Sequence, residues 1–268
     1  MHTHTRRVLI GLAIVAAAVV AVPAEAGIYY KAVTDVDGQG DAGDVSVEGW
    51  VDGEKAKVEF LESGNPMTPA GGYLLSQDGG RTILLVNPEE KTYAVWDLAA
   101  MMGMMGGMMK SMGPLLKFEV SQPRVEKLAD EDGGSLVGLT TRHYRYRTTY
   151  GMKVKVFGMG QESTVVSEQE IWATPQLQDL GLAVWLRKEP TKTGNEQLDK
   201  LIAAEMGKVA GFPLKSITVT TTTSQRGPAT TTRSVMEVKE LRRGDVPPGT
   251  FQLPAGYTEV QLLPAMPQ

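Results

Sequence analysis

Methionine sulfurs are the most concentrated reactive groups in this chain. Seven of its 14 methionines lie in one stretch of residues 98–116, which reads LAAMMGMMGGMMKSMGPLL. A helix turns by about 100° per residue, so a helix over 98–116 places all seven on one broad face with small residues opposite. Thioethers bind Cu(I), and unbranched Met side chains also adapt to irregular apolar surfaces. The stretch therefore has three possible roles. It could pack as part of the core, it could contact a lipid, an acyl chain or a partner helix, or it could bind Cu(I).

The metal alternative depends on helical spacing, because i, i+3 and i, i+4 positions bring sulfurs together. Its candidate copper ligands are Met102, Met104, Met105, Met108, Met109 and Met112. Neither His nor Cys accompanies these sulfurs, so copper ranks below the apolar roles, and we predict no cofactor.

Side chains for catalysis are scarce. The chain has no Cys, and we find no zinc motif, Walker A sequence or G-x-G-x-x-G pattern. Two of the three histidines, His2 and His4, lie in a leader that is expected to be cleaved. His143 stands between Arg142 and Arg145 on an outward strand face, where we expect a solvated surface residue rather than a general base. We predict that the chain is not an enzyme.

Carboxylate pairs such as Glu168/Glu170 and Glu89/Glu90 leave one enzymatic alternative, a carboxylate-dependent hydrolase of unrecognised type. Most such pairs on protein surfaces are simply solvated.

The first 26 residues predict a secretory signal peptide. Arg6 and Arg7 precede an apolar run over 8–22, and an A-x-A site ends at Ala26. We therefore expect a periplasmic or secreted protein with a single β-rich domain over 27–268. The formal net charge of −4 argues against nucleic-acid binding, which requires a basic face. We expect a monomer, with peripheral membrane contact as an open partner class.

Alternating apolar and polar residues predict about ten short antiparallel strands between residues 28 and 260. Hairpin turns are predicted at Asp52-Gly53, at 78–80 and at 132–134. A threonine-rich hairpin is expected over 217–223 and 230–241. Besides 98–116, a short helix is predicted from Pro175, and an amphipathic helix follows residue 196.

These elements predict an α+β fold in which a curved antiparallel half-barrel sheet carries helices over its concave face. A sheet this large tends to curl, and an apolar cavity is expected between sheet and helices. Seven exposed methionines would form an apolar patch that soluble monomers rarely tolerate, so the 98–116 helix should cover the cavity. The predicted cavity-lining residues are Trp96, Met101, Met104, Met105, Met108, Met112, Phe118 and Leu201.

Four stretches carry a resemblance to a known family. They are SQDGGRTILLVNPEEKTYAVW, LVGLTTRHYRY, EQEIWATPQL with the later GFPLK, and PPGTFQLPAGYTEV. In this order they resemble a domain-of-unknown-function family of exported bacterial proteins. That family is similar to the LolA-like superfamily of periplasmic lipoprotein carriers.

The resemblance implies a curved antiparallel sheet holding helices, with a hydrophobic ligand between, and it supplies no catalytic residue. The methionine-rich stretch departs from the usual pattern of the family. The predicted function is that of an exported, non-enzymatic carrier or binding protein for a lipid, acyl chain or lipoprotein-like partner.

Overall fold

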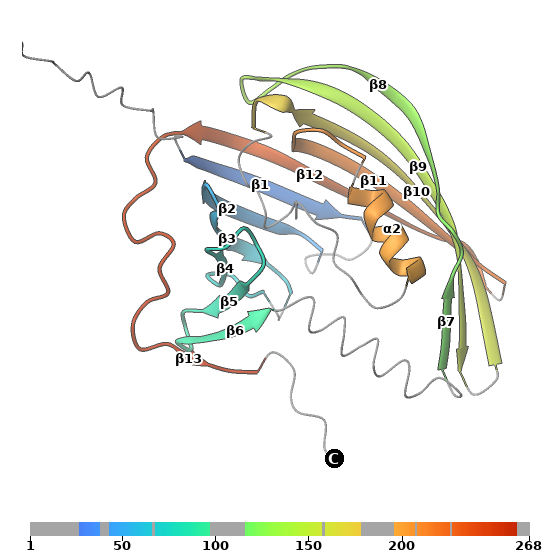
Figure 1. Cartoon of the computed structure of the whole chain (residues 1–268), viewed down its shortest axis with the longest axis horizontal. Coiled ribbons are helices and arrows are strands. Elements are labelled where there is room, and N and C mark those ends of the chain that lie inside the picture. The colour runs from blue at the N-terminus through green and yellow to red at the C-terminus, as the bar shows by residue number, and fades with distance from the viewer. Residues whose placement is uncertain are drawn as a thin grey trace, which may run out of the picture.

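The computed structural model describes residues 27–37, 43–65, 68–96, 116–156, 159–177, 196–206, 208–225 and 227–261. This part of the chain is mostly β, and its strands form one large, open and curved sheet (Figure 1). The strands are β1 Ile28–Val36, β2 Val45–Asp52, β3 Lys55–Ser63, β4 Tyr73–Ser76, β5 Ile83–Asn87, β6 Thr92–Trp96, β7 Leu116–Val120, β8 Arg124–Leu136, β9 Leu139–Val156, β10 Met159–Thr174, β11 Phe212–Ser224, β12 Thr230–Arg243 and β13 Thr258–Glu259.

The strand order along the sheet is β13-β6-β5-β4-β3-β2-β1-β12-β11-β10-β9-β7, and β8 also pairs with β9. Neighbours are antiparallel except β13, which pairs with β6 in parallel. The described residues therefore hold thirteen strands where the sequence predicted about ten. The prediction joined β7 and the start of β8 into one strand over 117–129, whereas the last short strand, predicted near Tyr257, is present as β13.

Local sequence explains most of the hairpins. Val47 and Val51 of β2 are buried on one face, and the polar residues between them lie on the other. Gly53 adopts a φ of 58°, which the tight turn into β3 requires and which glycine adopts at little cost. The predicted threonine-rich hairpin is present as β11 and β12, whose β-branched residues suit strands.

The predicted turn at 132–134 is wrong. The chain continues as β8 through these residues with a register shift between Asp132 and Ser135, and it turns instead at Val137-Gly138. Both turn residues have positive φ, 44° and 80°. The Asp-Gly-Gly signal thus marks a bulge within a long strand, and glycines are common at bulges.

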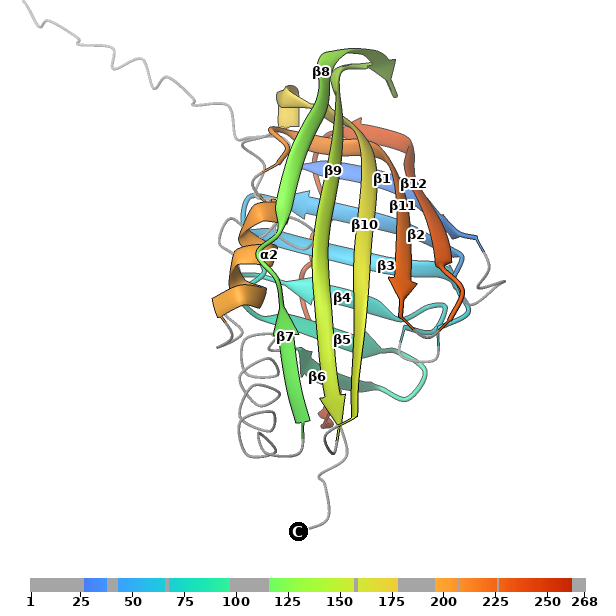
Figure 2. The same cartoon turned by 90° about the vertical axis from the view of Figure 1, so that its right-hand side faces the viewer.

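Within the described residues, helices cover less of the sheet than predicted. The described residues hold one α-helix, α2 (Glu196–Met206), and a short 3₁₀ helix at Pro175–Leu177. Figures 1 and 2 show α2 at the end of the sheet formed by β7 and β9, not across the whole concave face. Residues 97–115 lie outside the described residues, and Leu116 belongs to β7, so a helix reaching 116 is wrong at its last residue. The predicted signal peptide over residues 1–26 also lies outside them and stays a prediction.

The main core lies on the concave face. Buried residues of β1, β2 and β3, such as Tyr30, Val51 and Val58, share one apolar cluster with Leu214 of β11 and Val238 of β12. Residues from strands this far apart in the sheet meet because the sheet curves around them (Figure 2). Leu177 of the 3₁₀ helix packs into the same cluster.

A smaller core lies on the convex face of β4 and β5. Tyr73, Leu75 and Val86 are buried there against Phe251 and Tyr257 of the C-terminal segment 244–261. This segment runs along the outside of the sheet and ends in β13 beside β6. None of the described helices is long and apolar enough to cross a membrane.

Candidate functional site

An apolar patch on the concave face is the strongest candidate site. Around the buried core lie apolar side chains that are only partly covered: Val45, Leu85, Trp96, Met236 and Leu241. They come from β2, β5, β6 and β12 and point to the same side as the core, because residues two apart in a strand share a face. We call these five residues the concave patch. Such a patch on an open sheet is suited to binding an apolar group.

Trp96 is the most distinctive member of the concave patch. Its indole Nε1 is buried and has no hydrogen-bond partner in the described part of the chain. An unpaired buried N–H is unusual in folded proteins, because the lost hydrogen bond to water is not replaced. The Trp96 N–H group is therefore a hydrogen-bond donor without an acceptor, beside an otherwise apolar surface.

The structure places only some of the predicted cavity residues. Trp96 lies in the concave patch, and its predicted role in lining a ligand cavity stays a prediction. Leu201 is half-buried in α2, outside the cluster that holds Trp96. The backbone of Phe118 pairs with Val154 in the β7–β9 ladder, but its side chain lies outside the described part. All the predicted methionines, both as cavity and as copper ligands, lie outside the described residues and stay predictions.

Sequence reasoning missed the other members of the concave patch. Alternation within each strand was visible in the sequence and could have placed Leu85 or Met236 on an inner face. It could not show that these strands, distant in the chain, turn their inner faces towards one another.

At the α2 end of the concave face, Lys208 is held by three side chains. Its Nζ atom lies 2.6 Å from Thr148 Oγ1, 3.1 Å from Gln169 Oε1 and 2.5 Å from Glu205 Oε1. The Lys208 side chain is 3% exposed, and its backbone oxygen accepts a hydrogen bond from the Tyr146 hydroxyl. All its donors are engaged, so Lys208 anchors the segment after α2 and is not free for a ligand.

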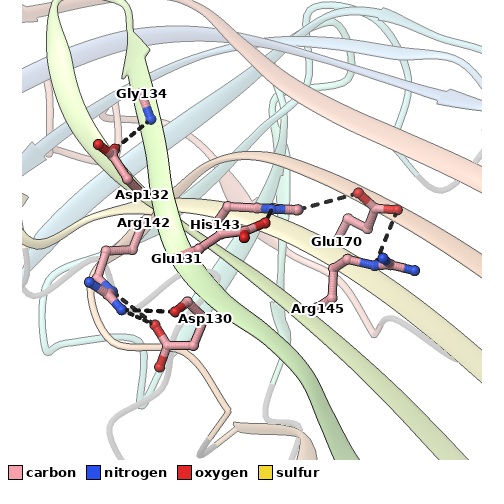
Figure 3. A network of polar contacts seen from close by, with 8 residues as sticks. All are labelled: Asp130, Glu131, Asp132, Gly134, Arg142, His143, Arg145 and Glu170. Atoms are coloured by element: carbon pink, nitrogen blue, oxygen red, sulfur yellow. Dashed lines mark hydrogen bonds and ion pairs between the residues drawn. The ribbon is translucent and has the colours of Figure 1, made fainter.

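The expectation for His143 is wrong. Its side chain is 13% exposed and its ring stacks on Trp172, with ring centroids 4.4 Å apart. Nδ1 lies 3.1 Å from Glu131 and Nε2 lies 3.3 Å from Glu170, so carboxylates contact both ring nitrogens (Figure 3). The strand face is outward as predicted, but residues of β8 and β10 cover the ring on that face.

The carboxylate pair Glu168/Glu170 is bound to cations. Glu168 accepts hydrogen bonds from Arg147, and Glu170 lies 3.7 Å from Arg145 and also contacts His143. The two acids therefore complete a ladder of cross-strand ion pairs between β9 and β10, which is a structural role.

An open pocket of about 590 Å³ is lined by the ends of β7 and β11, by residues 151–153 of β9 and by residues 162–164 of β10, and it contains two carboxylates. Hydrogen bonding to Lys153 lowers the pKa of the Glu162 carboxyl, whereas a general acid needs a raised pKa. The other carboxylate belongs to Glu119. Among the described residues, no group of three or more His, Cys, Asp or Glu could hold a metal ion.

Two comparisons with known proteins give a match. Residues 159–257 match the model of a domain of unknown function (DUF4412). A solved structure from Vibrio parahaemolyticus, described as an outer membrane lipoprotein-sorting protein domain, is similar over 85% of this chain and 89% of its own, with 11% identity and a TM-score of 0.31. No curated protein matches the chain.

The match over residues 159–257 bears out the resemblance to a family of unknown function. At 11% identity and a TM-score of 0.31, nothing of that domain's function carries over to this chain. Any proposal for the function of this chain must therefore come from the side chains of its own concave face.

Proposed function

We propose that this chain is an exported, non-enzymatic carrier or binding protein that holds a hydrophobic ligand against its concave face. The ligand class is a lipid, an acyl chain or the acyl group of a lipoprotein-like partner. The observation that carries the proposal is the concave patch, in which partly covered apolar side chains extend a buried core on the inner side of an open sheet.

The methionine-rich stretch completes the site in this proposal. We propose that the predicted helix over 98–116, which would end before Leu116 of β7, lies on the ligand, with Met101, Met104, Met105, Met108 and Met112 towards it. Thioether side chains re-pack around acyl chains of different shape at low cost, which suits a carrier that must release its load. The apolar run over 8–22 supports export to the periplasm or the exterior.

The test is native mass spectrometry with lipid extraction on full-length protein expressed with its leader and purified from the periplasm. We expect acyl lipid to co-purify with the wild type. Leu85→Asp places a charge in the concave patch and should abolish the bound lipid, because a buried carboxylate is costly beside an acyl chain.

Val95→Asp is the matched control. Val95 is 38% exposed and lies on the opposite face of the same pair of strands. Its variant should keep the lipid. Wild-type protein that carries no acyl lipid and takes up none from added phospholipid vesicles would contradict the proposal, as would lipid retained by a folded Leu85→Asp variant.

A further inference from the structure

The concave face changes character along β10, β11 and β12. Beyond the apolar residues, the side chains that share this face on β11 and β12 carry hydroxyl groups, and on β10 Ser167 adds another between Val165 and Gln169. Cross-strand register places Thr220 opposite both Ser167 of β10 and Thr232 of β12, and it places Thr218 opposite Ser234. We call the resulting surface the hydroxyl lane; its half-buried members are Ser167, Thr218, Thr220, Thr222, Thr232 and Ser234.

The hydroxyl lane carries no charge, although the same strands are rich in charge. Glu168 and Glu170 alternate with Ser167 on β10, and Arg233 stands between Thr232 and Ser234 on β12. Residues next to each other in a strand point to opposite faces, so these charges lie on the convex side. The two faces of the same three strands therefore present different chemistry.

Most hydroxyls of the lane are free to bind. Within the described part of the chain, the lane contains one side-chain hydrogen bond, from Thr220 to Ser167 at 3.4 Å. Thr218, Thr222, Thr232 and Ser234 make none. Each hydroxyl can donate one hydrogen bond and accept others, so the lane can bind a polar group of either kind.

Lys208, the cation that β10 brings nearest to the hydroxyl lane, already has an ion-pair partner. Gln169 lies opposite Thr218, and its side chain holds Lys208, whose ammonium is paired with Glu205. The hydroxyl lane itself holds no cationic side chain, so a ligand anion placed on the lane would find no positive charge among its members. Covering a charge that finds no partner is costly, whereas an uncharged polar group needs only hydrogen bonds.

The hydroxyl lane continues directly from apolar residues. On β11, Leu214 is followed on the same face by Ser216 and Thr218; on β12, Met236 of the concave patch is followed by Ser234. Each such step spans about 7 Å along a strand. A ligand lying along these strands therefore passes from apolar contacts to hydroxyl contacts within a few residues.

We infer that the ligand is an amphiphile with an uncharged, oxygen-rich head, such as an acylglycerol. Its acyl chain lies on the concave patch and its head on the hydroxyl lane. This inference rests on the proposed function and names the ligand class for the same face.

Three probes with one acyl chain test the inference: 1-oleoylglycerol, oleate and 1-oleoyl-lysophosphatidylglycerol, measured below their critical micelle concentrations by calorimetry. We expect the wild-type protein to bind 1-oleoylglycerol at least about tenfold more tightly than either anionic probe. Equal binding of all three, or a preference for an anionic probe, would overturn the inference and leave the proposed function standing. If none of the three binds, the proposed function fails and the inference fails with it.

Removing hydroxyl groups from the lane tests whether the lane causes the preference for 1-oleoylglycerol. The triple variant Thr218→Val, Thr220→Val and Thr232→Val replaces hydroxyls by methyl groups of similar size and should reduce the preference to less than about threefold, with oleate affinity unchanged. The control is Thr221→Val with Thr231→Val, which removes the hydroxyl pair 3.1 Å apart on the convex face of the same hairpin. The control should keep the preference, and a folded triple variant that also keeps it would overturn the inference.

Discussion

Lys208 Nζ lies 2.6 Å from Thr148 Oγ1, and this contact ties the segment after α2 to the concave face of β9. The Thr148 hydroxyl donates in turn to Glu205 of α2 at 2.8 Å, so helix, segment and strand form one closed set of hydrogen bonds. Thr148 is fully buried. The position of the helix at this end of the sheet therefore depends on an ion pair whose lysine is buried and whose glutamate is partly exposed.

Replacing Lys208 by Met should destabilise the protein by at least about 2 kcal/mol, because Glu205, Thr148 and Gln169 lose a shared donor. Chemical denaturation measures the change. Lys200→Met is the control, since Lys200 pairs with Glu196 on the exposed side of the same helix, where an i, i+4 pair contributes about 0.3–0.5 kcal/mol. Equal effects of the two substitutions would contradict the structural role given to Lys208.

Gly49 makes room for the Tyr30 ring on the concave face. A Cβ atom at position 49 would overlap the Tyr30 ring, which is buried in the core. Gly49→Ala should therefore cost about 1–3 kcal/mol through overpacking. Gly244→Ala should be tolerated, because a Cβ there meets nothing within 4 Å. Thermal unfolding distinguishes the two variants, and an unchanged melting temperature for Gly49→Ala would rule out this close contact.

Tyr73 should make stability depend on alkaline pH. Burial under the C-terminal segment raises the pKa of its phenol from 10.0 to about 12. Between these values the folded chain holds a proton that the unfolded chain has lost, so stability falls as pH rises from 10 to about 12. Tyr73→Phe should lose less stability than the wild type over this range, as measured by urea unfolding. Identical pH profiles would show that the Tyr73 phenol is not linked to folding.

Copper binding gives a test of the methionine-rich stretch that does not depend on lipid. We expect purified mature protein to bind Cu(I) weakly or not at all under reducing conditions, because no His or Cys accompanies the thioethers. Stoichiometric, tight uptake that disappears in the Met104/Met105/Met108→Leu variant would instead favour the metal role. Leu keeps the apolar volume, so this comparison separates sulfur chemistry from packing.

Strand pattern and turn chemistry predicted much of the sheet. The period of two over 135–150 predicts Tyr144 and Tyr146 on the inward face and Arg145 and Arg147 on the outward face. The structure confirms this division, since both tyrosines are buried and both arginines are exposed. The error at 132–134 arose because an Asp-Gly-Gly sequence fits a bulge as well as a turn. Local signals do not distinguish the two, since the choice depends on the register of β8 against β9.

The candidate site was less accessible to sequence reasoning. Trp96 was predicted to line a ligand cavity; the structure packs it against the core of the concave face, and the cavity stays a prediction. The surroundings of His143 depend on which residues of β8 and β10 stand beside β9, so Glu131 and Trp172 could not be assigned as its neighbours. The hydroxyl lane likewise needs the register of β10, β11 and β12.

The most direct test of ligand binding on the concave face uses tryptophan fluorescence and a brominated fatty acid, which quenches only at short range. Trp96 lies on the concave face and Trp50 on the convex face. Two variants are needed, each retaining one of these residues and carrying Phe at the other three Trp positions. We predict saturable quenching in the Trp96-only variant and none in the Trp50-only variant. Absence of quenching at Trp96, or equal quenching at both residues, would contradict ligand binding on the concave face.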